Sequence, residues 1–110
     1  MEKNFNFPTF AVVETDLILD KRLSDSEKLL YSFITVLCNN KENSCFATNS
    51  YFATLMNCEM RTIQRYLFNL RKYGYIKIDI QGENRRTIQP MICKFIKDRK
   101  ELFDYDWLNL

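Results

Sequence analysis

Residues 60–76 read MRTIQRYLFNLRKYGYI and decide the fold. Their apolar side chains recur three and four positions apart, which predicts an amphipathic helix from about Met60 to Tyr73, ended by Gly74. The apolar stripe that we expect to pack on a core consists of Met60, Ile63, Leu67 and Leu70. The opposite side of the helix is polar and carries no acidic residue. It holds Arg61, Thr62, Arg65, Asn69 and Lys72, with Gln64 nearer the boundary.

A shorter helix precedes this one. The cluster Thr48-Asn49-Ser50 contains residues favoured at helix starts, and the following turns place Phe52, Leu55 and Met56 on one face. Asn57 is a suitable left-handed residue for its end. Only two or three residues then separate the two helices, and helices joined so tightly form a helix-turn-helix.

Upstream, Ser24 and Glu27 have the spacing of a capping box, with Leu23 as the preceding apolar residue. Helical periodicity follows, so we expect a helix over 25–38. Weaker signals favour an edge strand at 10–13, one helical turn at 16–19 and a short strand at 44–47.

After Gly74 the apolar residues recur at every second position instead of at helical spacing. Ile76, Ile78 and Ile80 alternate with polar residues, a polar turn covers 81–85, and alternation resumes over 86–92. Pro90 cannot donate to a ladder, so the second strand is an outer strand or its pairing ends there. A hairpin directly after a helix-turn-helix is a wing.

The expected fold is therefore α+β and mainly helical: a winged helix-turn-helix of three helices and a β-hairpin, with a short N-terminal strand. We expect an arm at 1–9, the domain at 10–94 and a tail at 95–110 that is compatible with a last helix.

Charge is unevenly divided along the 110 residues, although the net charge is only +2. Residues 60–97 carry a net +7, whereas 1–59 and 98–110 are net negative. A basic centre in an otherwise acidic chain favours a face that binds a polyanion, and the alternative is an unevenly charged solvated surface.

Composition argues against several classes of function. The chain has no histidine, and its four cysteines include no C-x-x-C pair, so zinc spacings and the commonest general base are missing. We expect reduced, buried thiols, no metal, no cofactor and no catalysis. The longest apolar run has ten residues, too short to cross a bilayer, and no signal segment opens the chain, so we expect a soluble cytoplasmic protein without membrane contact.

The polar face of the second motif helix has the chemistry needed in a DNA major groove. Arginine can bind guanine through two hydrogen bonds, and glutamine or asparagine can do the same with adenine. In the wing, Arg85 and Arg86 are candidates for minor-groove or phosphate contacts, or are solubilising charges. Asn49 and Ser50 are candidates for phosphate binding, or serve only as helix caps.

Three runs carry a resemblance to a known family: LSDSEKLLYSFI, CFATNSYFATLMN and EMRTIQRYLFNLRKYGYIKI. They resemble the winged helix-turn-helix domains of plasmid and phage replication initiators and replisome-organiser proteins over about residues 10–92. Thr62, Gln64 and Arg65 match the DNA-facing positions of that family. The chain departs from it in the turn, where Asn57 and Glu59 replace the usual Gly and capping Ser.

The resemblance implies a sequence-specific binder of double-stranded DNA, used in replication initiation, DNA segregation or transcription regulation. It also implies a bacterial, plasmid or phage origin, and either a stand-alone binder or an N-terminal module. A replication or segregation protein is a further expected partner.

The competing hypothesis is a winged-helix module that binds protein through apolar residues outside the basic face. The same residues are candidates for homodimerisation: Phe68, Leu102, Phe103, Trp107 and Leu108. A symmetric dimer would contact half-sites about one helical turn apart.

Overall fold

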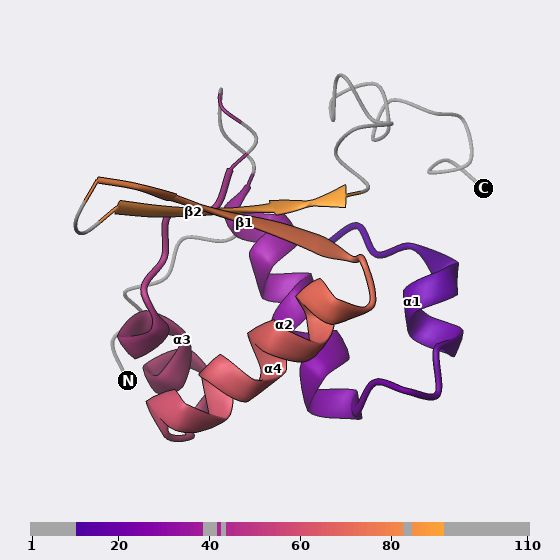
Figure 1. The fold of residues 1–110 in the computed structure, drawn as a ribbon. Helices are drawn as coiled ribbons and strands as arrows, with labels where there is room; N and C mark the ends of the chain where they lie inside the picture. The colour runs from indigo at the N-terminus through magenta and orange to yellow at the C-terminus, as the bar shows by residue number, and fades with distance from the viewer. Residues whose placement is uncertain (1–10, 39–41, 43, 83–84, 92–110) are drawn as a thin grey trace, which may run out of the picture.

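The computed structural model describes residues 11–38, 42, 44–82 and 85–91. The described elements, in chain order, are the helices α1 (Thr15–Leu19), α2 (Asp25–Leu37), α3 (Asn49–Met56) and α4 (Met60–Lys72) and the strands β1 (Ile76–Gln81) and β2 (Arg85–Pro90). The β1–β2 hairpin lies along one side of the helices, and α1 and α3 lie at opposite ends of the molecule (Figure 1). The predicted winged helix-turn-helix architecture is confirmed.

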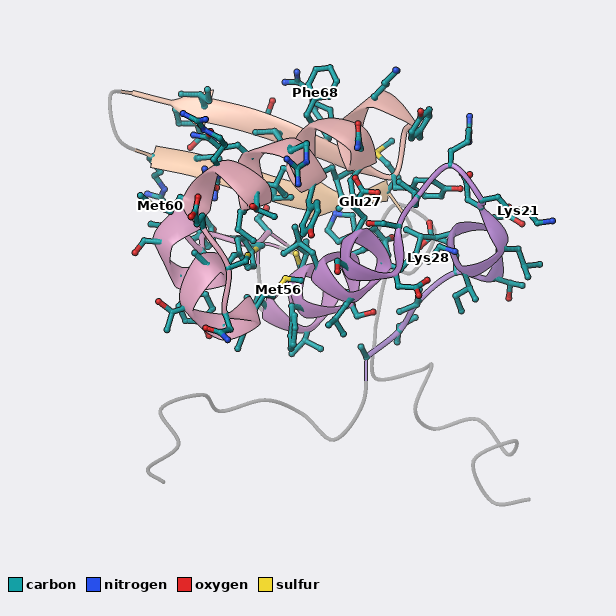
Figure 2. All side chains as sticks on the ribbon, turned by 90° about the horizontal axis from the view of Figure 1, so that it is seen from below. Lys21, Glu27, Lys28, Met56, Met60 and Phe68 are labelled. Carbon is teal, nitrogen blue, oxygen red and sulfur yellow. The ribbon has the colours of Figure 1, made fainter. Side chains whose placement is uncertain are left out.

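Helix α2 begins as the sequence predicts. The backbone N–H of Ser24 donates to Glu27 Oε1 at 2.7 Å, and the N–H of Glu27 donates to Ser24 Oγ at 3.2 Å. This reciprocal pair satisfies two of the N–H groups that a helix start otherwise leaves without partners. It also fixes the carboxylate of Glu27, a residue only 3% exposed, between α2 and α4 (Figure 2).

The core is shared by every helix and both strands. The larger side chains of the core are Leu17, Leu23, Leu30, Tyr31, Ile34, Phe52, Ile63, Leu67, Leu70, Ile76 and Ile88. Burying one leucine, isoleucine or phenylalanine side chain stabilises a fold by about 1.5–3 kcal/mol. Cys38 and Cys45 are buried in the same core, and Cys38, Cys45 and Cys58 are free thiols, as predicted, while Cys93 lies outside the described residues.

Two left-handed residues set the ends of the motif helices. Asn57 has φ 54°, and the N–H of Cys58 donates back to the carbonyl of Ala53 at 3.0 Å, which ends α3 and turns the chain toward α4. Gly74 has φ 84°, and the N–H of Tyr75 returns to the carbonyl of Leu70 at 2.9 Å. Glycine adopts this conformation without a Cβ penalty, so the predicted helix end at Gly74 is confirmed.

The hairpin is antiparallel, with Ile76 opposite Pro90, Ile78 opposite Ile88 and Ile80 opposite Arg86. These six side chains share one face of the hairpin because residues two apart in a strand point the same way. The hairpin packs on α4 through β1 and on α2 through β2. Pro90 ends β2, which agrees with its inability to donate to a ladder.

Three local predictions differ from the structure. The strand expected at 44–47 is reduced to one bridge between Cys45 and Ile88, and residues 11–13 form no strand. Met60 was expected in the core but is 53% exposed, since the first turn of α4 extends beyond the layer that contains Ile63. The arm at 1–9 and the tail at 95–110 lie outside the described residues.

Polar contacts hold α1 at the C-terminal end of α4. Arg22 Nη2 donates to Asp20 Oδ2 at 2.6 Å, and the Tyr75 hydroxyl donates to the same oxygen at 2.8 Å. The guanidinium of Arg22 also lies 4.2 Å from the centre of the Tyr73 ring. The hydrogen bonds from Arg22 and Tyr75 hold the pKa of the Asp20 carboxyl well below its usual range, since they favour the charged form. Within the described ranges no helix combines the length and the apolar character needed to span a membrane.

Candidate nucleic-acid interface

Helix α4 presents an uncompensated basic face to solvent. Arg61, Arg65 and Lys72 are exposed, and none of them forms an ion pair within the described part of the chain. The guanidinium of Arg65 lies 5.8 Å from the centre of the Tyr66 ring, and Lys72 Nζ lies 5.4 Å from the centre of the Tyr73 ring. With 13 residues the helix is about 20 Å long. Its outward face therefore offers separated cations to a polyanion.

The flank of α4 that faces α2 is occupied by contacts within the protein. Asn69 Nδ2 donates to Glu27 Oε2 at 2.6 Å, and Asn69 and Thr62 are both half-buried. One N–H of the Asn69 amide, a sequence-based candidate for DNA contact, is therefore engaged within the protein. The wheel places Asn69 on the outer half of the helix, but α2 packs against that edge and its buried carboxylate takes the amide.

The other flank of α4 faces the wing and borders a hollow. Gln64 and Arg71 are exposed beside it, and Phe68 is 54% exposed and lies on the side of α4 turned away from α2 (Figure 2). The lining residues from both elements are Asn49, Gln64, Leu67, Phe68, Arg71, Ile78 and Arg86. Sequence reasoning missed Arg71; its position seven residues after Gln64, within a basic pair with Lys72, was the signal that could have found it.

A second hollow lies between the wing and the starts of α3 and α4. It is lined by Phe46, Ala47, Thr48, Asn49, Ser50, Met60, Ile80, Arg85 and Arg86. Arg85 is exposed, and its guanidinium lies 5.0 Å from the centre of the Phe46 ring. Ile80 is 75% exposed, so the outer part of the wing projects beyond the helices. Among the described residues, the linings of both hollows are apolar, neutral polar or basic and include no carboxylate.

Asn49 and Arg86 border both hollows and contact each other. Arg86 Nη1 donates to Asn49 Oδ1 and Nη2 donates to the carbonyl of Ala47, both at 2.6 Å. Burial lowers the pKa of the Arg86 guanidinium. Arg86 stands opposite Ile80, one position further from the turn than Arg85, which stands opposite Gln81.

The cap of α3 is Thr48, whose Oγ1 accepts from the N–H of Tyr51 at 3.1 Å. Asn49 and Ser50 are therefore the first two residues of the helix and not its cap. Ser50 is exposed beside the second hollow. The candidate partner residues Leu102, Phe103, Trp107 and Leu108 lie outside the described residues.

The assembled surface suits an anionic partner with a groove. Described basic residues of α4 and the wing converge on one region, while no group of three potential metal ligands occurs in the described part of the chain. A protruding helix with guanidinium and amide groups can enter a major groove, and a projecting hairpin can contact the adjacent backbone.

Comparison with protein families agrees with this geometry. The description "Helix-turn-helix domain" matches residues 21–76, from the loop before α2 to the first residue of β1. This range is more than half of the chain, and the chain belongs to the helix-turn-helix domain family. Domains of this family bind DNA and are typically non-enzymatic. Neither a curated protein nor a solved structure gives a significant match to the chain.

Proposed function

We propose that this chain binds double-stranded DNA in a sequence-specific way, with α4 in the major groove and the wing along the adjacent backbone. The observation that carries the proposal is the outward face of α4, where Arg61, Arg65 and Lys72 are exposed without a carboxylate partner among the described residues. A solvated face on an ordinary helix is usually interspersed with both signs of charge. This helix has no acidic residue at all.

The proposed roles follow the position of each side chain on α4. Arg61, Gln64 and Arg65 stand on the first two turns, the part of a recognition helix that usually contacts base edges. Lys72 lies near the C-terminal end and suits a phosphate contact. Thr62 is half-buried and suits a thymine methyl or a phosphate at the edge of the groove.

The wing and α3 supply the proposed backbone contacts. Arg85 stands beside the hairpin turn, and Ser50 lies exposed at the start of α3, where backbone N–H groups and the helix dipole favour a phosphate. We add Arg71 to this set because it is exposed beside the hollow between α4 and the wing. Asn69 and Arg86 are left out because their polar groups already bind within the protein.

A salt titration of duplex binding tests the proposal directly. About four to six phosphate contacts per protomer imply a log–log slope of affinity against salt concentration of about −4 to −5. The titration uses the full chain and a mixed pool of duplexes, with single strands of the same sequences as the control. A slope near zero, or equal affinity for the single strands, would contradict the proposal.

Selection of random duplexes against the protein distinguishes its possible uses and its assembly. A palindromic motif with half-sites about one turn apart would support a homodimer, for which the exposed Phe68 offers an apolar contact. Repeated direct sites would favour replication initiation or segregation, and a single operator-like site would favour transcription regulation. Failure to enrich any motif would favour the protein-binding alternative instead.

A further inference from the structure

On the face of the hairpin that carries its isoleucines, the outer part of the wing is more exposed than the base. Near its base, Ile76 is 3% exposed and Ile88 is fully buried, so that end of the hairpin is fixed by packing. Ile80, near the turn, is 75% exposed and has left the core. Packing alone therefore does not determine the angle of the wing over the motif helices.

Two arginines of β2 contact the segment that leads into α3: the guanidinium of Arg85 lies 5.0 Å from the centre of the Phe46 ring, and Arg86 makes the hydrogen bonds. Arg86 stands opposite Ile80, and its two terminal nitrogens donate to Asn49 Oδ1 and to the carbonyl of Ala47, each at 2.6 Å. The planar guanidinium presents its N–H groups in a fixed fork, so satisfying two acceptors at once fixes both distance and orientation. A lysine ammonium in the same place carries the same charge without this fork.

We propose that Arg86 is a positioning residue: its contacts with Asn49 and Ala47 hold the wing at the angle that lets Arg85 and α4 reach the same duplex. This inference rests on the proposed DNA-binding function, because it assigns Arg86 to the arrangement of the interface and not to a direct phosphate contact. Both acceptors are neutral, so the link retains the positive charge of the wing while fixing its direction.

The test compares Arg86→Lys with Arg86→Gln. If Arg86 acts by position, both variants lose about tenfold in affinity for a long selected duplex, because neither keeps the two-acceptor fork. The loss is smaller on a duplex shortened to the α4 site. If Arg86 instead binds phosphate by its charge, Arg86→Lys keeps wild-type affinity and only Arg86→Gln loses it, which would overturn the inference.

A second readout does not require DNA. Amide hydrogen exchange in β1 and β2 should accelerate in Arg86→Lys, Arg86→Gln and Asn49→Ala, while exchange in α4 stays at the wild-type rate and shows that the variants are folded. Lys77→Gln is the matched control, since it removes one exposed charge from the same hairpin without touching the link. Unchanged hairpin exchange in all three variants would also overturn the inference.

The two failures can be told apart. Loss of salt-dependent duplex binding by the wild-type chain would sink the proposed function, whereas the hairpin exchange would still report on the link. A double variant Asn49→Ala/Arg86→Gln should lose no more affinity than Arg86→Gln alone, because the two changes break one contact. Additive losses would contradict the link.

Discussion

Arg22 and Arg86 each join two parts of the fold, but the charge of only one is balanced. Arg22 lies near the C-terminal end of α4 and contacts the carboxylate of Asp20 at 2.6 Å. Arg86 lies near the other end of the interface and donates to an amide oxygen and a carbonyl oxygen, also at 2.6 Å. The geometry is equally close in the two places, so the difference between them is electrostatic.

This difference teaches how the domain can be stable and still attract a polyanion. An arginine paired with a carboxylate forms a dipole, and its field falls off faster with distance than the field of a single charge. An arginine held by neutral acceptors keeps its full charge. The wing and the outward face of α4 therefore remain electropositive, whereas the corner near α1 is neutralised.

The largest expected effect comes from removing one arginine on each side of this comparison. Arg65→Ala should weaken binding to the selected duplex by about 5- to 150-fold, equivalent to the 1–3 kcal/mol of one good base contact. Arg22→Ala removes the same charge but none of the proposed base contacts, and should weaken binding by no more than about twofold. Fluorescence anisotropy at one fixed salt concentration measures both.

Lys72→Ala sharpens the same test. It should weaken specific and non-specific duplexes about equally, whereas Arg65→Ala should act mainly on the specific one. Equal losses for Arg22→Ala and Arg65→Ala would show that net charge, and not its location, determines binding, and the comparison would then fail.

A smaller effect is expected from a variant in which Arg86 of the wing gains a carboxylate partner, as Arg22 has in Asp20. Asn49→Asp places a carboxylate against Arg86 and an acidic residue in the first turn of α3, so thermal stability should rise. Affinity for duplex DNA should fall by about tenfold because a carboxylate is added beside the wing, whereas the salt slope should stay unchanged because Arg86 itself contacts no phosphate. Thermal unfolding and a salt titration of this variant check the prediction, and a slope shallower by about one would contradict the positioning role of Arg86.

The smallest effect concerns the acid stability of the corner near α1. Because the folded-state pKa of Asp20 lies below its usual value of about 4, its charged form contributes stability above that pH, and the contribution is lost as the pH falls through the folded-state pKa. Asp20→Asn should therefore lower the melting temperature slightly at pH 6, and the gap to wild type should close toward pH 2. Melting curves by circular dichroism across this range measure the gap; a gap that widens in acid would contradict the assignment.

Local signals in the sequence predicted the helices and strands well. The sequence could not show contacts between residues that are far apart in the chain. The capping box at Ser24, the left-handed Asn57 and the helix end at Gly74 each involve neighbours within a few positions, so their chemistry is visible in the chain. Asn69 binds Glu27, 42 residues earlier, and Arg86 binds Asn49, 37 residues earlier. A helical wheel gives the direction of Asn69 but not the buried carboxylate that meets it.

The sequence pattern also could not predict which side chains at the edges of the core are exposed. Met60 continues the apolar spacing of α4, yet it lies past the last layer of packed side chains and lines a hollow instead. Arg71 was not among the sequence-based candidates, and the position of the wing shows that it lines the hollow.

The shared carboxylate of Glu27 limits how the specificity of this domain can evolve or be engineered. One of its oxygens accepts the N–H of Ser24 and the other accepts the amide of Asn69, so a change on the recognition helix at position 69 also loosens the first turn of α2. A library meant to redirect the domain to new target sequences should vary positions 61, 64, 65 and 68 and keep asparagine at 69. The outward face of α4 can change its sequence freely only at positions whose side chains do not stabilise the fold.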